Sequence, residues 1–352
     1  MVRPLTTKRK GKATKFRKVC LLVSLATLFF IPTYAFGAAY YYCSKEAAGS
    51  HDGSSWANCW DCEDGDSDEV NWSTLETAAA SQPVYLFMDG GTTSQTYNGM
   101  MVVDASGSSD TNRVYIMPGY AAQQMGVPGS HDSHAGKVVW DLQGIAESDA
   151  IQIRWEKYVT LDGYADPRPS GGNNPKLVVG WSNDPGGSLV NIHDSEYIHI
   201  RNVEVTHEDH ESYRGNGIGG GKESGSALRQ GNICEYCYVH DTGNGVVNDH
   251  GINFEGQNGA IIRYNEMRNV GDGGSEVIGC SGQGSQDCEA YYNLVVDSAL
   301  AFIDIAVVRF NTVYIPSDAE NTVRAYTTRN GEVGSSAIYI ENNFFYDLRS
   351  TT

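Results

Sequence analysis

The stretch AIIRYNEMRN (260–269) decides the fold, because its form recurs along the second half of the chain. Apolar and polar residues alternate in it, which predicts a β-strand that buries every second side chain. The recurrences are YIHIRNVEVTH (197–207), NICEYCYVHD (232–241), EAYYNLVVD (289–297), VVRFNTVYI (307–315) and AIYIENNFFYD (337–347).

Aligning these runs on their last inward apolar residue places Asn265, Asn293, Asn311 and Asn343 in one column. The intervals along Val239, Met267, Val295, Val313 and Phe345 are 28, 28, 18 and 32 residues. A fixed motif at unequal intervals predicts a solenoid whose loops differ in length. Stacked Asn side chains can then hydrogen-bond from rung to rung at a bend.

The rest of the chain also reads as short apolar runs between Gly- and Asp-rich turns, which is typical of an all-β protein. One short helix is predicted at WSTLETAAA (72–80), with Asn71 as its N-cap. The loop GNGIGGGKESGSALRQG (215–231) is rich in Gly, but no strand–turn–helix pattern surrounds it. A nucleotide-binding motif is therefore excluded there.

The N-terminal half resembles a known superfamily. YYYCSKEAAGSHDGSSWANCW (40–60), followed by the predicted helix and VYLFMDGG (84–91), is similar to the entry of secreted right-handed parallel β-helix proteins of the pectate-lyase-like superfamily. RVYIMPGY (113–120), KVVWDLQG (137–144) and YVTLDGY (158–164) resemble their first full coils. The resemblance covers roughly residues 40–348 and implies a right-handed parallel β-helix with a short N-terminal capping helix. It implies no single activity, since this fold hosts lyases, hydrolases, epimerases and non-enzymatic surface proteins.

Residues 1–37 have the layout of a secretory signal peptide: a basic segment, the apolar run VCLLVSLATLFFI (19–31) and small residues after it. An uncleaved anchor is the alternative, although the apolar run is short for a membrane span. We expect residues 38–352 to form a single β-helix domain of a protein that is secreted or at the cell surface. A solenoid needs a cap over its last rung, and none follows FFYD (344–347), so we expect a C-terminal truncation or another chain over that end.

The net charge of the chain limits the kinds of molecule that it can bind. Removing the eight basic residues of the leader changes the net charge from −18 to −26. A surface with this much negative charge repels nucleic acid and anionic lipid. We therefore expect no binding to nucleic acid, and none to a membrane after the signal peptide is cleaved. An acidic polysaccharide would need a cation or a local basic patch.

Seven cysteines remain after the leader, so at least one thiol stays free or pairs between chains. Cys280 and Cys288 flank one loop and can staple it, and Cys43 can pair with Cys59 or Cys62. The pairs Cys59–Cys62 and Cys234–Cys237 have the spacing of half zinc sites. In an unbroken strand, however, Cys234 and Cys237 would face opposite sides, which argues against zinc.

The stretch VNDHGINFEG (247–256) borders the densest group of ionisable residues in the chain. Ile252 and Phe254 are predicted to be buried, and Asn253, Glu255 and the His250 side chain to be exposed. Because equivalent positions on adjacent rungs lie about 4.8 Å apart, the polar ends of three successive runs should meet here. The predicted catalytic residues are His207, His210, Arg214, Asp249 and His250. The alternative is structural, since Asp, Asn and Gly also form tight turns.

We expect an extracellular polysaccharide as the partner and, first, a polysaccharide lyase that cleaves by β-elimination. A His would take the proton beside a uronate carboxyl group, and Arg214 would balance the charge. Asp241, Asp249 and Asp272 would hold Ca²⁺ through oxygen ligands. A glycoside hydrolase with two carboxyl groups on nearby rungs is the second interpretation. A non-catalytic, glycan-binding or adhesive surface β-helix is the third.

Overall fold

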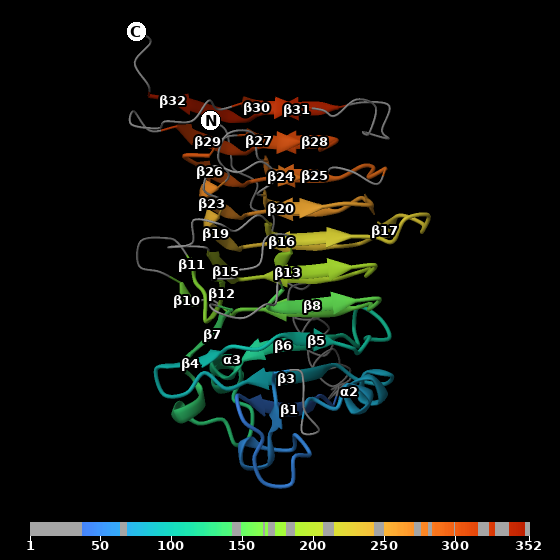
Figure 1. The fold of residues 1–352 in the computed structure, drawn as a ribbon, viewed down its shortest axis with the longest axis vertical. Helices are drawn as coiled ribbons and strands as arrows, with labels where there is room; N and C mark the ends of the chain where they lie inside the picture. The colour runs from blue at the N-terminus through green and yellow to red at the C-terminus, as the bar shows by residue number, and fades with distance from the viewer. Residues whose placement is uncertain are drawn as a thin grey trace, which may run out of the picture. The chain divides into compact units, whose positions relative to one another are not determined.

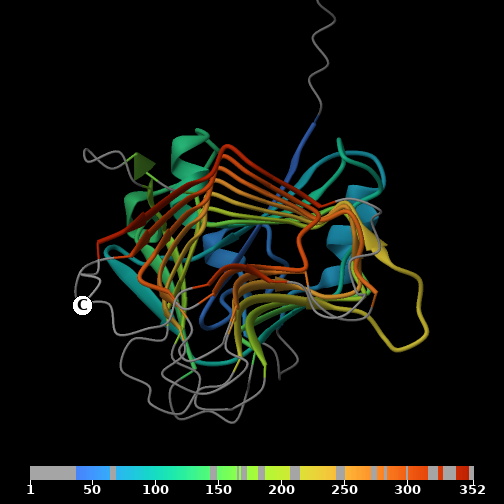
Figure 2. The same cartoon turned by 90° about the horizontal axis from the view of Figure 1, so that it is seen from above.

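The computed structural model describes residues 37–63, 69–142, 149–164, 166–167, 173–180, 187–206, 215–242, 250–270, 276–280, 284–298, 300–315, 324–327 and 338–348. Within these ranges the chain is a right-handed parallel β-helix, which confirms the predicted fold class. Figure 1 shows the coils stacked as rungs, and Figure 2 shows the same coils superposed along the stacking axis. Residues 38–352 form one compact unit.

Each full coil contributes one strand to each of three parallel sheets. Sheet 1 contains, in stacking order, β2 (Trp60–Asp61), β1 (Ala39–Ser44), β3 (Val84–Met88), β6 (Val114–Pro118), β9 (Val159–Asp162), β14 (His199–Arg201), β18 (Ile233–Glu235), β22 (Ile261–Arg263), β25 (Glu289–Tyr291), β28 (Val307–Arg309) and β31 (Tyr339–Glu341). Sheet 2 contains β4 (Ser94–Tyr97), β7 (Lys137–Asp141), β12 (Leu177–Gly180), β15 (Val203–Thr206), β19 (Tyr238–Thr242), β23 (Glu266–Val270), β26 (Leu294–Val296), β29 (Thr312–Ile315) and β32 (Phe344–Asp347). Sheet 3 contains β5 (Met101–Val103), β8 (Ile151–Arg154), β13 (Ser188–His193), β16 (Asn216–Gly221), β20 (His250–Phe254), β24 (Glu276–Gly279), β27 (Leu300–Ile303) and β30 (Arg324–Thr327).

Short elements decorate the loops. β10 (Asp166–Pro167) pairs with β11 (Asn173–Asn174), and β17 (Arg229–Gln230) with β21 (Gln257–Asn258). The helical elements are η1 (Trp56–Asn58), α2 (Trp72–Ala79), α3 (Gly119–Gln124) and η2 (Asp132–His134). The predicted helix is α2, and the Asn71 side chain caps it by accepting a hydrogen bond from the Thr74 N–H at 3.0 Å.

Each alternating run read from the sequence as one strand is in fact two strands around a sharp corner. A residue with positive φ stands at the corner between sheets 1 and 2, for example Tyr236 and Tyr264, both at φ 57°. That left-handed conformation is unfavourable for a bulky residue. Stacking offsets part of the cost, because the rings of Tyr236, Tyr264, Tyr292 and Phe310 lie 5.0, 5.2 and 5.1 Å apart in succession.

The Asn column is confirmed as a ladder just after this corner. Asn265 Nδ2 donates to Asn293 Oδ1 at 3.1 Å, and Asn293 Nδ2 donates to Asn311 Oδ1 at 3.0 Å. The ladder continues from Asn311 to Asn343 at 3.0 Å. Backbone groups join it, since the Asn265 N–H also donates to Asn293 Oδ1 at 3.0 Å.

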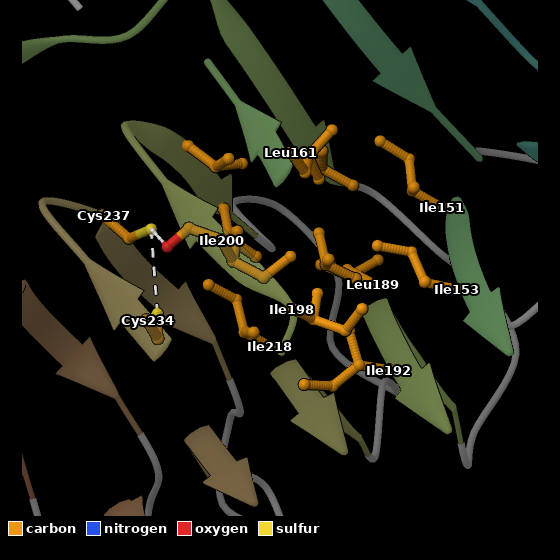
Figure 3. Close-up of a cluster of buried hydrophobic side chains, with 14 of the residues drawn as sticks. Ile151, Ile153, Leu161, Leu189, Ile192, Ile198, Ile200, Ile218, Cys234 and Cys237 are labelled. Atoms are coloured by element: carbon orange, nitrogen blue, oxygen red, sulfur yellow. Dashed lines mark hydrogen bonds between the residues drawn. The ribbon is translucent and has the colours of Figure 1, made fainter. Parts of the chain in front are cut away.

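Inward side chains form columns that fill the interior. Sheet 3 stacks Ile151, Val190, Ile218, Ile252, Ile278 and Phe302 in register, and all are fully buried. Figure 3 shows how such side chains from neighbouring rungs converge on one interior. Burial of each contributes about 1.5–3 kcal/mol, and the inward column fixes which residues face outward.

The predicted disulfide Cys280–Cys288 is present, and of the two partners predicted for Cys43 the structure has Cys62. Among the described residues, Cys59, Cys234 and Cys237 are free and buried. The expectation that Cys234 and Cys237 face opposite sides is wrong. Their sulfur atoms lie 3.8 Å apart, because the corner at Tyr236 resets the alternation and turns both side chains inward.

The last described rung exposes its apolar side chains. Ile340 and Phe345 are each 48% exposed, whereas Val308 and Val313 below them are 1% and 2% exposed. The expectation of a truncated or covered C-terminal end stays a prediction. None of the described helices is both long and apolar enough to span a membrane.

Candidate functional site

The outer face of sheet 3 carries polar side chains. A Cβ on Gly219 would lie 2.0 Å from Ser188 Oγ and 2.8 Å from Asn216 Nδ2, so those two side chains lie over the outer surface of β16. A Cβ on Gly217 would instead meet Val205 and Val239 in the interior. Polar residues at the outward positions of successive rungs therefore form one continuous surface, which we call the sheet 3 face.

The entry end of these strands holds a hydrogen-bonded network. Asp149 accepts hydrogen bonds from the Ser188 N–H at 2.8 Å and from the side-chain amides of Gln152 and Asn191, both at 2.9 Å. Asn216 Nδ2 donates to Ser188 Oγ at 3.1 Å. The network fixes amide and hydroxyl groups on the surface, which suits recognition of a ligand rich in hydroxyl groups.

The exit end holds an oriented imidazole. His193 Nδ1 lies 3.1 Å from Asp194 Oδ2, and the Asp194 side chain is only 1% exposed. Asp194 is itself held, because Arg229 binds its Oδ1 at 2.6 Å and the Glu223 N–H donates to Oδ2 at 2.9 Å. The two groups are not aligned as a hydrogen bond, but a fixed carboxylate this close favours the tautomer that carries its proton on Nδ1 and leaves Nε2 as the acceptor.

The next rung places no side chain beside that Nε2. The next rung has Gly221 at the matching position, and a Cβ there would lie 3.9 Å from His193 Nε2. The previous rung places Arg154 in register with His193. The two side chains therefore share one column of the sheet 3 face, about 4.8 Å apart at their backbones.

Arg154 has no ion pair with any carboxylate in the described ranges, unlike Arg229 on Asp194. Its guanidinium stacks over the ring of Trp155, with Cζ 4.3 Å from the ring centroid. Trp155 has φ 62° and is 58% exposed, which is unusual for so large an apolar side chain. Arg154 thus offers a positive charge, and Trp155 an aromatic surface, to a ligand beside His193.

A buried carboxyl group lies directly after Trp155. Glu156 is 7% exposed, and its Oε2 accepts a hydrogen bond from Ser106 Oγ at 2.5 Å. Burial raises the pKa of Glu156 to about 7, and the neighbouring Asp104 carboxyl group adds to the rise, although the Ser106 hydrogen bond lowers it. Glu156 is therefore protonated in the folded protein over a pH range where an ordinary Glu is ionised.

This shift predicts how stability depends on pH. Between pH 4.5 and about 7 the folded state keeps a proton that the unfolded state has released, so stability falls as pH rises. The loss is on the order of 3 kcal/mol once the pH is above 7. Glu156→Gln should remove this loss, making the variant more stable than the wild type at pH 8 but not at pH 4.

Urea unfolding at both pH values measures the effect. Glu266→Gln, which alters an exposed carboxylate paired with Arg268, is the control and should follow the wild type. If the free energy of unfolding of Glu156→Gln differs from that of the wild type by the same amount at every pH from 4 to 8, the raised pKa of Glu156 is wrong.

The residues predicted as catalytic are only partly placed. His207, His210, Arg214 and Asp249 lie outside the described residues. His250 begins β20 and stands in register with Asn216 at the entry end of the sheet 3 face. The expectation that its side chain is exposed is wrong, since His250 is 7% exposed, and Asn253 is likewise buried at 1%. Side chains of adjacent rungs, only about 4.8 Å away, cover outward groups on both sides.

The calcium prediction rests on Asp241, Asp249 and Asp272, of which only Asp241 is described. Asp241 Oδ2 lies 2.7 Å from His240 Nδ1, and its Oδ1 accepts a hydrogen bond from Asn269 Nδ2 at 2.7 Å. Burial lowers the pKa of His240, but the hydrogen bonds with Glu204 and Asp241 outweigh this and raise it. The described residues contain no group of three or more side chains suited to a metal ion, and the calcium site stays a prediction.

Sequence reasoning missed Arg154, His193 and Asp194, because it searched for dense ionisable loops. A weaker signal was present. The segments QIRWE (152–156) and NIHDS (191–195) share an alternation in which Gln152 and Arg154 match Asn191 and His193. Two strands with polar outward residues at matching positions indicate a polar outer face.

Comparisons with known proteins give distant similarities. No protein-family model and no curated protein matches the chain. Among solved structures, pectate lyase Pel9A has 12% sequence identity and a TM-score of 0.44 over 85% of this chain and 78% of its own. Deglycosylated pectin methylesterase from Aspergillus niger has 10% identity and a TM-score of 0.36 over 82% and 88%. Alginate lyase from Paenibacillus sp. str. FPU-7 has 16% identity and a TM-score of 0.29 over 75% and 97%.

Proposed function

We propose that the protein is a secreted carbohydrate-active enzyme that binds a uronate-containing polysaccharide on the sheet 3 face and cleaves it by β-elimination. One observation carries the proposal: Arg154, whose guanidinium has no carboxylate partner among the described residues, stands in register with His193, whose Nδ1 lies 3.1 Å from the buried Asp194 carboxylate. Elimination next to a carboxyl group needs these two functions, a cation for the carboxylate and a base for the proton.

Binding uses the polar columns and the exposed ring. Amide and hydroxyl groups of the Asp149 network donate to and accept from sugar hydroxyls, and Trp155 packs against the apolar side of a sugar ring. Arg154 supplies the local positive charge that a chain with a mature net charge near −26 otherwise lacks. Calcium held near Asp241, Asp249 and Asp272 is kept as a proposed second source of positive charge.

In the reaction, His193 Nε2 removes the proton on the carbon that bears the carboxyl group. Arg154 stabilises the negative charge that develops on that carboxylate. The electron pair then forms the carbon–carbon double bond as the bond to the leaving glycosidic oxygen breaks. That oxygen takes up a proton from water, and His193 afterwards releases to the solvent the proton that it accepted. Asp194 stabilises the transient imidazolium, since its carboxylate stays beside Nδ1.

One observation favours glycoside hydrolysis as a second candidate. Asp104 and Glu156 interact from neighbouring rungs, so two carboxyl groups lie near each other, as glycoside hydrolysis requires. Glu156 is only 7% exposed, however, so contact with a substrate would require the turn after β8 to move. Glycan binding without catalysis is the third possibility.

A panel of acidic and neutral polysaccharides tests the proposal on the mature protein, with Ca²⁺ or with a chelator. Products with unsaturated ends, formed from uronate polymers alone, would support the lyase. New reducing ends without unsaturation would show that the protein is a glycoside hydrolase and not a lyase. Binding of a polysaccharide without cleavage would show that it is a glycan-binding module. Loss of activity on chelation would support the calcium site.

Arg154→Gln is predicted to lower kcat/KM on an acidic polymer about 10–100-fold. A hydrogen bond to a charged group contributes about 1.5–3 kcal/mol, and Gln keeps the polar contact but loses the charge. Initial rates at several substrate concentrations measure it. Arg268→Gln on sheet 2 is the matched control and should retain the wild-type value. Equal activity of the two variants would remove Arg154 from the mechanism.

A further inference from the structure

The corner between sheets 1 and 2 brings two otherwise separate positions together. In the Asn-bearing rungs, the residue three before each Asn takes part in the ladder: Asn293 Nδ2 donates to the Ile262 carbonyl oxygen at 2.9 Å, and Ile262 stands three before Asn265. In each rung, the ladder position and the residue three before it therefore both lie at the inside of the corner. In the rung of β18 and β19 these positions are Cys234 and Cys237.

The two thiols are adjacent and shielded from solvent. Their sulfur atoms lie 3.8 Å apart, and the residues are 0% and 2% exposed. Figure 3 shows both side chains pointing toward each other, with Cys237 also directed at Ile200. Asn265 Oδ1 accepts from the Cys237 N–H at 2.9 Å, so Cys237 occupies the first position of the Asn ladder.

Cysteine is not required by this geometry. The neighbouring rungs fill the same two positions with Ile200 and Val203, with Ile262 and Asn265, and with Ala290 and Asn293. The β18–β19 rung alone among these carries cysteine at both. The chain also folds where thiols are oxidised, given the disulfides Cys43–Cys62 and Cys280–Cys288.

We propose that Cys234 and Cys237 form a third disulfide, which closes the corner around Tyr236 and anchors the first rung of the Asn ladder. Two S–H bonds break and one S–S bond forms. The two electrons and two protons reduce the disulfide of a thiol–disulfide oxidoreductase to two thiols. The Cys59 thiol is then the one left over from the seven cysteines of the mature chain.

The bond should form before the coils close. Burial raises the pKa of Cys234 well above its ordinary value, and the thiolate is the attacking species. In the folded protein both sulfur atoms are out of reach of an oxidoreductase. Oxidation during export should therefore be complete, whereas protein folded with reduced thiols should acquire this bond slowly.

Alkylation of exported protein tests the proposal. The mature chain is unfolded in urea with iodoacetamide and no reductant, and the labelled cysteines are located by peptide mass. We expect label on Cys59 alone, and a peptide holding Cys234 and Cys237 that is two hydrogens lighter than its dithiol form. Label on Cys234 and Cys237 would overturn the proposal.

A variant serves as the control for incomplete unfolding in urea, which would also leave Cys234 and Cys237 unlabelled. In Cys237→Ser, the thiol of Cys234 loses its partner and should become labelled under the same conditions. Cys59→Ala should show no label on Cys234 or Cys237. If Cys234 stays unlabelled in Cys237→Ser, it is protected by something other than the proposed bond, and the assignment is wrong.

Discussion

Replacing His193 by Ala is expected to lower turnover about 10²–10⁴-fold, because a positioned general base contributes that much to proton transfer. The fold should survive, since the His193 side chain lies on the sheet 3 face with 27% of it exposed. Turnover per folded molecule, measured from unsaturated product, separates this loss from any loss of stability. Asp194→Asn should also slow the reaction, because it disturbs the orientation and the charge of the imidazole.

Two other histidines make the comparison decisive. His131→Ala, on an exposed position before η2, is the control and should leave turnover unchanged. His250 stands at the opposite end of the strands, roughly five residues or 16 Å along from the His193 column, so it cannot act on the same atom as Arg154. If His250→Ala abolishes turnover and His193→Ala does not, the base is His250, one of the three histidines that the sequence indicated.

Asn293→Ala is expected to lower the free energy of unfolding by about 3–6 kcal/mol. The substitution removes the acceptor of the Asn265 N–H and the donor to the Ile262 carbonyl oxygen, both in the interior. It also breaks the side-chain bonds to Asn265 and Asn311. Each buried polar group left without a partner costs about 1–3 kcal/mol. Urea unfolding followed by circular dichroism measures the change.

The same substitution at the end of the ladder is the matched control. Asn343 is partly exposed. It donates to the Val308 carbonyl oxygen at 2.9 Å and accepts from the Asn311 N–H at 2.9 Å, and at this end of the ladder water can replace its side chain in both bonds. Asn343→Ala should therefore cost about 1 kcal/mol. Equal costs at Asn293 and Asn343 would show that the ladder contributes through local turn geometry and not through buried hydrogen bonds.

The stacking of coils could be predicted from the sequence because side chains alternate with a period of two. Val239, Met267, Val295 and Val313 align in the structure as they align in the sequence. The corner within each run could not be predicted, since Tyr at positive φ carries no recognisable turn signal. That same omission led to the wrong orientation of Cys234 and Cys237.

The candidate site was harder to predict for a different reason. Arg154 and His193 are neighbours only because their strands pair, and the chain between them passes through sheets 1 and 2. Their alternating segments hold few charges, so they do not stand out in composition. His250 was found because its charged neighbours in sequence drew attention, but its burial depends on side chains of adjacent rungs.

The corner at Tyr264 and its equivalents also governs how the chain tolerates changes in length. Successive ladder positions are separated by 28 residues from Cys237 to Asn265 and by 18 from Asn293 to Asn311, so the other two turns of a coil absorb the difference. Excising a segment between two equivalent ladder positions removes one complete coil and rejoins equivalent backbones. Excising one residue more or fewer within a strand inverts inside and outside for the remainder of that strand. The coil, and not the residue, is therefore the unit in which such a chain can be shortened or extended.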